Sequence, residues 1–391
     1  MMEFSEARRH GRKPQSTDTR ISLFLPVMID PRSGGFRAVI AFAKGLARMG
    51  RDIRVLSLRA SDAALSEAMR TCPVERFRRL EFEPAGYMMS DYLLHSATSD
   101  ARKWLKSVRT ESTQGEILLV FGDFPTGVFT WARRTRAFTK TVAYSWGLPA
   151  LYPHFRAATE ILRSRRLLVM MLRVASPIID KRYFEIAEAD AVIPISPWLG
   201  HFLSICLGIK CARAISPPID TEYFRPAEEG PLTSTPYALA VGSPTDLDFS
   251  TIADIATSIP IVKAGRGTIS NCRNIGFVES DASLRNLYTH AQFLINSPRL
   301  EPFGLIPLES MACGTPVISI GYPGADDHIP DPPLGAVAYS TDELARKANQ
   351  LWLQGTSPEL RVRVREYVER LFSVSVCARN LAEFLDGLQS S

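Results

Sequence analysis

Short apolar runs alternate with longer amphipathic stretches along this chain. The runs ISLFLPV (21–27), IRVLSL (53–58) and EILLVFG (116–122) have the length and β-branched content of buried strands. Between the first two lies RSGGFRAVIAFAKGLARMG (32–50), which predicts a glycine loop and an amphipathic helix that ends at Gly50. Strand, helix and strand in this order are typical of a parallel sheet built from βαβ units.

The alternation occurs twice, and a proline-rich segment separates the two occurrences. Residues 213–236 contain five prolines and therefore predict a linker. The other strand candidates are KTVAYSW (140–146) and DAVIPIS (190–196) before the linker, and YALAVG (237–242), IPIVKAG (259–265), NIGFV (274–278), AQFLINS (291–297) and TPVISI (315–320) after it. The sequence thus predicts an α/β fold with two doubly wound, Rossmann-like domains, whose strand ends face an interdomain cleft.

Length and composition agree with this division. The chain has 391 residues, enough for two domains of ordinary size, and it is 46% hydrophobic, enough apolar material for two cores. The first twenty residues are polar and basic and lack the apolar run of a signal peptide. We expect a flexible basic tail over 1–20, a first domain over 21–212, a linker over 213–236 and a second domain over 237–371.

Several classes of protein are excluded by the same pattern. No segment reaches the roughly 18 consecutive apolar residues that cross a bilayer. Six cysteines without a Cys-x-x-Cys spacing argue against a disulfide framework and a zinc site, and they fit a reducing cytoplasm. The formal charge of +5 is too small to indicate nucleic-acid binding. The histidines have no metal-ligand spacing, so no metal is expected.

Candidate chemistry gathers in SPRLEPFGLIPLESMACG (297–314), which follows a predicted strand. It reads as a loop and a short helix, with Pro307 in the first turn and Gly314 at the end. The free N–H groups of a helix start favour an anion such as a diphosphate. Glu301 precedes the loop and Glu309 lies about one turn into the helix, so both carboxylates can accept hydrogen bonds from sugar hydroxyls.

These residues resemble the Glu-x7-Glu signature of retaining GT-B glycosyltransferases of family 4, the glycosyl transferases group 1. The resemblance extends to four further segments in the family's order. They are SGGFRAVIAFAKGLARMGRDIRVLSL (33–58), ISPWLGHFL (195–203), PPIDTEYFRP (217–226) and FSVSVCARNLAEFLDGL (372–388), and the stretch from NIGFV through TPVIS (274–319) is similar almost position by position. The last helix of that fold crosses back to the first domain, which we expect of residues 372–391.

The resemblance implies a role for each matching residue. Glu309 would hold the ribose hydroxyls of a nucleotide sugar, and Glu301 would contact the transferred sugar. Backbone amides around Phe303, Gly304 and Leu305 would bind the sugar and the β-phosphate, and the other implied donor-site residues are Gly34, Gly35, Gly242, Ser243, Gly276 and Phe277. The resemblance implies no cofactor and no metal, because this fold does not use the Asp-x-Asp of the other glycosyltransferase fold. Front-face transfer needs little base chemistry, since the departing diphosphate itself can take the acceptor proton.

The sequence departs from the family pattern where the diphosphate is usually clamped. After the first strand of the second domain, VGSPTDLDF has Ser243 where the family places an arginine, and Asp248 or Phe249 where it places a lysine. Asp248 instead looks like a helix cap. The cations that can replace the clamp are Lys263 and Arg266, which we predict to be catalytic, together with Arg299 and Arg37.

Two regions bear on the acceptor. Asp123 and Trp146 follow strands of the first domain and are predicted to shape the acceptor side, although plain packing is an equal alternative for Trp146. The segment 155–184 is apolar and rich in arginine. It can be an internal helix with arginines on its solvent face, a contact with an anionic membrane surface, or both. The second possibility would place the protein at the inner face of the membrane.

The sequence therefore predicts a retaining enzyme that transfers a hexose or deoxyhexose from a nucleotide-diphosphate sugar. The acceptor would be a glycan, a lipid-linked sugar or a small molecule, as in the biosynthesis of cell-envelope polysaccharides. The main alternative is a protein of the same fold that binds a nucleotide or glycan without transfer, having lost its clamp. An epimerase or a phosphorylase of this fold is disfavoured, because neither a catalytic histidine set nor a pyridoxal-phosphate lysine can be placed.

Overall fold

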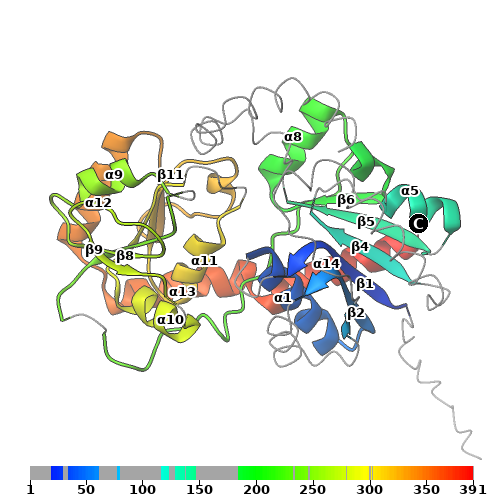
Figure 1. The fold of residues 1–391 in the computed structure, drawn as a ribbon, viewed down its shortest axis with the longest axis horizontal. Coiled ribbons are helices and arrows are strands. Elements are labelled where there is room, and N and C mark those ends of the chain that lie inside the picture. The colour runs from blue at the N-terminus through cyan, green and yellow to red at the C-terminus, as the bar shows by residue number, and fades with distance from the viewer. Residues whose placement is uncertain are drawn as a thin grey trace, which may run out of the picture.

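The computed structural model describes two α/β domains that lie side by side (Figure 1). The described residues are 19–29, 34–60, 77–79, 116–122, 128–136, 138–146, 184–231, 234–244, 247–278, 280–298, 301 and 303–390. The segment 155–183, with its predicted membrane contact, lies outside them, as do Asp123 and Arg299.

The first domain is a parallel sheet of six strands in the order β3-β2-β1-β4-β5-β6. Its strands are β1 (Ile21–Ile29), β2 (Ile53–Ala60), β3 (Phe77–Arg79), β4 (Ile117–Phe121), β5 (Lys140–Ser145) and β6 (Ala191–Pro194). Ile21 of the central strand pairs with Ile53 on one side and Ile117 on the other. The described helices of this domain are α1 (Gly34–Arg48), α5 (Val128–Thr135), η3 (Phe184–Glu188) and α8 (Pro197–Leu207).

The second domain repeats this topology with a sheet in the order β12-β11-β10-β7-β8-β9. Its strands are β7 (Ala238–Val241), β8 (Ile261–Ala264), β9 (Arg273–Gly276), β10 (Leu294–Asn296), β11 (Val317–Ile320) and β12 (Gly335–Ala338). Its helices are α9 (Phe249–Ile255), α10 (Asp281–His290), α11 (Leu305–Ala312), η4 (Ala325–Asp327), α12 (Thr341–Gln354) and α13 (Pro358–Phe372). The predicted fold class of two doubly wound parallel sheets is confirmed.

Polar residues at the helix starts explain where several helices begin. Ser196, Ser280, Ser340 and Ser357 each accept a hydrogen bond from a backbone N–H in the first turn of the following helix. Asp248 does the same for α9, where its carboxylate accepts from the Ser250 N–H. The capping role predicted for Asp248 is therefore confirmed.

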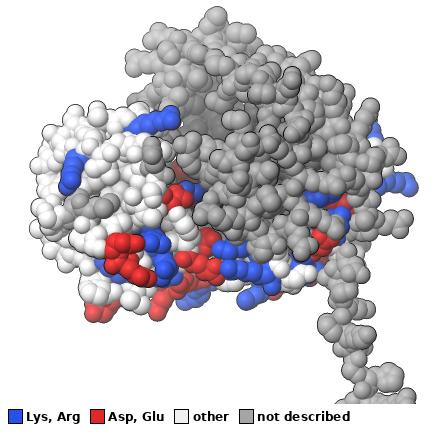
Figure 2. Space-filling model, turned by 60° about the horizontal axis from the view of Figure 1, so that its bottom comes forward, with Lys and Arg blue, Asp and Glu red and all other residues white. Residues whose placement is uncertain are grey.

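The C-terminal helix α14 (Val374–Gln389) leaves the second domain and lies beside α1 of the first (Figure 1). The two helices cross closely at Gly45, where an added Cβ would lie 2.4 Å from the Ala378 Cβ. On the face that Figure 2 shows, described basic and acidic side chains lie next to one another along the lower edge. Close packing and paired charges thus join the two domains.

Two strands of the structure were not predicted from the sequence. Strand β3 is only three residues long, and β12 has the sequence GAVA, which has little apolar bulk. Both lie at the outer edges of their sheets. An edge strand pairs on one side only, so it needs less of the β-branched content that marks a central strand.

Candidate functional site

A cleft of about 620 Å³ lies between the domains, within the size range of small-molecule sites. It is lined by residues that follow β1, β5 and β6 in the first domain and β7, β8, β9 and β10 in the second. The strand order reverses between β1 and β4 and between β7 and β10, and ligands of doubly wound sheets bind near such points. The predicted site residues that line it are Gly34, Gly35, Arg37, Trp146, Gly242, Ser243, Arg266, Phe277, Glu301, Phe303, Gly304, Leu305 and Glu309.

Glu309 is a buried carboxylate on α11, with 5% of its surface exposed. Arg37 of the first domain donates to its Oε1 over 3.2 Å, and the Tyr288 hydroxyl lies 3.4 Å from its Oε2. Burial raises the pKa of Glu309, and the positive charge of Arg37 opposes that shift. A buried carboxylate of this kind can bind two neighbouring hydroxyls, because each of its oxygens accepts more than one hydrogen bond.

Glu301 lies at the start of α11 and caps the loop that precedes it. Its Oε1 accepts the N–H groups of Phe303 at 3.1 Å and of Gly304 at 2.8 Å. The two amides that were predicted to be free for a ligand are therefore occupied by this carboxylate. The same contact demonstrates that the amide pair binds an anionic oxygen, as expected for a helix start.

Tyr322 contacts this loop, and His328 contacts Tyr322. The Tyr322 hydroxyl donates to the Phe303 carbonyl at 3.1 Å and lies 2.7 Å from His328 Nε2. The direction of the second hydrogen bond depends on which ring nitrogen of His328 carries the proton. Burial lowers the pKa of His328 to about 4, so the ring is uncharged at neutral pH.

Gly304 has no room for a side chain in this arrangement. Its φ is +93°, and an added Cβ would lie 2.1 Å from the Tyr322 hydroxyl. Only glycine adopts this backbone conformation without strain. The conformation that directs two amides onto the Glu301 carboxylate therefore depends on the glycine of the Pro-Phe-Gly sequence.

Two glycines at the start of α1 allow close contacts, one across the cleft and one within the first domain. An added Cβ at Gly34 would lie 2.7 Å from Cδ1 of Leu305, across the cleft. At Gly35 it would lie 2.5 Å from the ring of Trp146. The space at these positions is filled by side chains in this structure, and Trp146 forms part of the cleft wall.

Lys263 does not face the cleft, contrary to its predicted role as a diphosphate cation. Its side chain is completely buried, and its ammonium donates to the carbonyls of Arg266 and Gly267 and lies 5.0 Å from the centre of the Phe249 ring. A buried ammonium is stable only where carbonyls or acids surround it. Here Lys263 holds the loop after β8 in place, so its contribution is structural.

Arg266 is the cation of that loop that does line the cleft. It is exposed, and its guanidinium lies 5.9 Å from the centre of the Phe277 ring. Ser243 faces the same cleft from the end of β7. Of the four predicted replacement cations, Arg266 and Arg37 thus reach the cleft and Lys263 does not, while Arg299 lies outside the described residues.

Gly265 allows the ends of β7 and β8 to approach closely. Gly242, Gly265 and Gly276 all have positive φ, and Gly265 donates its N–H to the Gly276 carbonyl. An added Cβ at Gly265 would lie 2.2 Å from the backbone oxygen of Gly242. Gly242 and Gly265 line the cleft. Gly276, predicted as a donor-site residue, does not line it, and its carbonyl accepts the N–H of Gly265.

We therefore expect Gly265→Ala to destabilise the second domain by about 3 kcal/mol or more, through strained φ and backbone overlap. Urea unfolding of the purified protein measures the change. The matched control is Gly230→Ala, because an added Cβ there has no atom within 4 Å. Equal midpoints for the two variants would contradict the close approach of β7 and β8.

Comparisons with known proteins add independent findings. A protein of Burkholderia thailandensis described as a probable transglycosylase is 29% identical over 148 residues, 34% of this chain and 38% of that protein's length. Residues 264–371 match the family Glycosyl transferases group 1.

The complete chain resembles solved GT-B structures. Sucrose-phosphate synthase of Thermosynechococcus elongatus superposes with a TM-score of 0.69 at 17% identity, covering 95% of this chain and 99% of the other. HepE of Anabaena, solved with UDP and glucose, superposes with a TM-score of 0.63 at 15% identity, covering 94% and 99%. The fold is therefore GT-B.

The segment that matches Glycosyl transferases group 1 contains Glu301, Glu309 and the whole of α11. It also contains two cleft residues that were not predicted, Asp281 and Tyr288. Both belong to α10, which begins shortly after a predicted strand. Ligands of doubly wound sheets bind at such strand ends, so this position could have marked the two residues as candidates. Their partners lie in other elements, so the sequence alone did not identify them.

Two features are absent from the part of the chain that the structure describes. No group of three or more His, Cys, Asp or Glu in this part of the chain is placed to hold a metal ion. None of its helices combines the length and the apolar character required to cross a membrane.

Proposed function

We propose that this protein is a retaining glycosyltransferase that uses a nucleotide-diphosphate sugar as donor. The observation that carries the proposal is the buried carboxylate of Glu309 on the wall of the cleft. A buried carboxylate suits a ribose diol, because each of its oxygens accepts more than one hydrogen bond.

The family match and the GT-B fold support glycosyl transfer as the reaction class. HepE, which has this fold, was solved with UDP and glucose, and this supports a nucleotide sugar as the partner. We propose a hexose or deoxyhexose as the transferred group and a glycan, a lipid-linked sugar or a small molecule as the acceptor. The proposal places the reaction in cell-envelope polysaccharide synthesis at the cytoplasmic side of the membrane.

In the proposed reaction the acceptor oxygen attacks the anomeric carbon on the face from which the diphosphate leaves. The bond from the anomeric carbon to the diphosphate oxygen breaks, and that oxygen takes the acceptor proton. Stabilising the charge of the leaving diphosphate is then the main requirement. The reaction as proposed needs no metal, because Arg266, which lines the cleft, supplies positive charge to the diphosphate.

A transfer assay with a panel of nucleotide sugars tests this function. The account expects at least one donor to be consumed, with release of its nucleoside diphosphate and retention of the anomeric configuration by NMR. An inverted product would refute the retaining mechanism. Binding of a nucleotide sugar without turnover, with acceptors of all three classes present, would favour the alternative of a binding protein.

Arg266 is expected to contribute charge to the diphosphate in this reaction. Replacing it with alanine should lower kcat/KM about tenfold, which corresponds to about 1.4 kcal/mol at the transition state. Ser243→Arg in the same variant should restore part of the loss, because residue 243 also lines the cleft. Arg346→Ala, an exposed arginine of α12, is the matched control. Equal activity of the Arg266 and Arg346 variants would remove Arg266 from the site.

A further inference from the structure

Arg37 reaches from the first domain into the second and pairs with two carboxylates there. Its NH1 lies 3.2 Å from Glu309 Oε1, and its NH2 lies 2.7 Å from Asp281 Oδ1. The guanidinium also lies 5.7 Å from the centre of the Phe224 ring. Its hydrogen bonds are therefore directed at carboxylates of the second domain, which differs from the diphosphate role expected from the sequence.

Burial raises the pKa of Glu309, and Arg37 favours its charged form. The titratable and charged groups that face it are Arg37 from α1, Asp281 and Tyr288 from α10, and Cys313 beyond the end of its own helix. Arg37 is the cation of this set, and Asp281 adds a second negative charge. Without Arg37, a buried carboxylate would remain beside another acid, and such a group takes up a proton.

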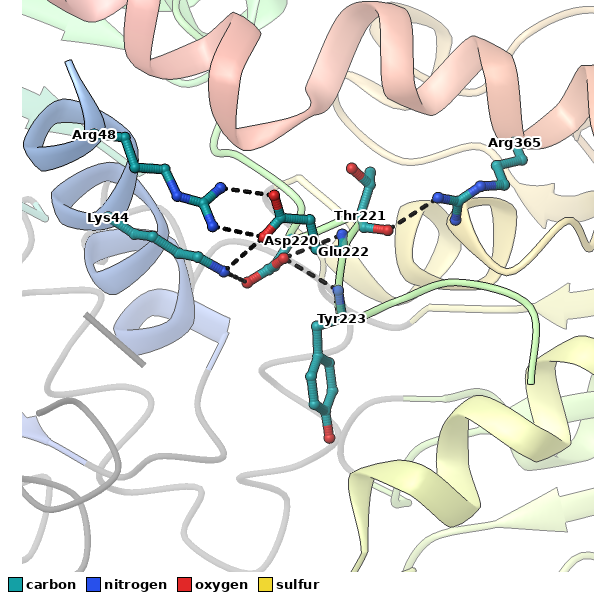
Figure 3. A network of polar contacts seen from close by, with 7 residues as sticks. All are labelled: Lys44, Arg48, Asp220, Thr221, Glu222, Tyr223 and Arg365. Atoms are coloured by element: carbon teal, nitrogen blue, oxygen red, sulfur yellow. Dashed lines mark hydrogen bonds and ion pairs between the residues drawn. The ribbon is translucent and has the colours of Figure 1, made fainter. Parts of the chain in front are cut away.

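The position of Arg37 is fixed by the rest of α1. Lys44 Nζ lies 2.7 Å from Asp220 Oδ2, and Arg48 donates two hydrogen bonds of 2.7 Å to the Glu222 carboxylate (Figure 3). Both acids belong to the linker. On the other side of the linker, Arg365 of α13 donates to the Thr221 carbonyl at 3.0 Å (Figure 3). The linker thus joins α1 to the second domain.

We infer that Arg37 is a positioning residue, an inference that rests on the proposed function. Arg37 keeps the ribose-binding carboxylate of Glu309 charged and oriented only while the first domain is closed on the second. Nucleotide affinity and domain closure are then coupled through one ion pair. Opening the cleft moves Arg37 away, and the carboxylate loses both its orientation and its counter-charge. The nucleotide binds the closed form more tightly for that reason.

The first experiment needs no ligand. Thermal unfolding of the wild type and of Arg37→Ala is measured from pH 5 to pH 8, each also in a Glu309→Gln background. Without Arg37 the folded-state pKa of Glu309 rises further above its unfolded value, so the folded state binds more protons and stability falls as pH rises through that interval. The linker network stays charged, because hydrogen bonding from Arg48 lowers the pKa of Glu222 to about 2.

We expect Arg37→Ala to have a lower Tm than the wild type. This deficit in Tm should grow by about 3 °C between pH 5 and pH 8, the order of effect of a single lost charge pair in a protein of this size. In the Glu309→Gln background the deficit should be independent of pH. Arg37→Lys should behave like the wild type. A deficit that is the same at every pH with Glu309 intact would overturn the inference.

The second experiment measures affinity for UDP, GDP, ADP and dTDP by calorimetry from pH 6 to pH 9. Arg37→Ala should weaken binding about tenfold at pH 6 and recover as pH rises, because an ionised acceptor binds hydroxyls more strongly than a neutral one. In the Glu309→Gln background, Arg37→Ala should weaken nucleotide binding less than about twofold, because the side chain at position 309 is already neutral.

The outcomes separate this inference from the proposed function. If Arg37→Ala weakens nucleotide binding equally in the wild-type and Glu309→Gln backgrounds, Arg37 acts directly on the diphosphate. That result would overturn the inference and leave the proposed function standing. If none of the nucleotides binds the wild type, the proposed function fails. The pH-dependent Tm deficit would then still support the charge pairing of Arg37 with Glu309.

Discussion

Replacing Glu301 with glutamine is expected to lower the rate of sugar transfer about a hundredfold and to leave nucleoside diphosphate affinity within about threefold, in the range seen when one charge-stabilising group is removed. The glutamine oxygen can still accept from the amides of Phe303 and Gly304, so the loop keeps its conformation. What is lost is the negative charge beside the proposed sugar position. Steady-state kinetics and calorimetry on the same preparation separate the two effects.

Glu301→Ala is the informative companion to this variant. It removes both the charge and the acceptor for the two amides, so the loop before α11 loses its cap. Nucleotide affinity should then fall as well as turnover. If Glu301→Gln transfers sugar at the wild-type rate, the carboxylate has no part in the chemistry and its role is limited to capping the loop.

Replacing Glu309 with alanine is expected to weaken nucleoside diphosphate binding by about 1.5–3 kcal/mol, the contribution of hydrogen bonds to a charged acceptor. The variant also leaves Arg37 paired with Asp281 alone, which lowers the closing attraction between the domains. Both changes reduce affinity. Calorimetry with the nucleotide that binds the wild type best gives the value.

Two controls define this result. Glu359→Ala removes an exposed carboxylate of α13, remote from the residues that line the cleft, and should leave affinity unchanged. Circular dichroism of Glu309→Ala checks that the fold persists. A folded Glu309→Ala protein that binds the nucleotide as the wild type does would place the ribose elsewhere.

The fold was predictable because the central strands are buried on both faces. Strand β4 is completely buried, and its continuous apolar sequence marked it as a strand without any alternation. Strands β3 and β12 lack that signal, because β3 has only three residues and β12 has the sequence GAVA. The prediction therefore succeeded where a strand contains a run of bulky apolar residues and failed where it is very short or built of small ones.

The site was predictable as far as its residues are close in sequence. Glu301, the Pro-Phe-Gly turn and Glu309 fall within one strand–loop–helix unit, and the structure places the described ones together in the cleft. Arg37 and Glu309 are 272 residues apart, and only the closed arrangement of the domains brings them into contact. No local pattern encodes such a pair.

Lys263 illustrates a different limit. Its position after the strand core of β8 suggested a side chain at the sheet edge, but the alternation of strand side chains directs it into the interior instead. The carbonyls of the following glycine-containing loop stabilise its charge there. Predicting this required the conformation of the loop, which depends on the positive φ of Gly265 and Gly267.

The measurement that tests the central claim most directly is a calorimetric titration of the wild-type protein and Glu309→Gln with UDP, GDP, ADP and dTDP. The account predicts that the wild type binds at least one of them at a single site, and that Glu309→Gln binds the same nucleotide about tenfold more weakly. Absence of binding by all four, or equal affinities of the two proteins, would contradict a nucleotide-sugar site built on Glu309.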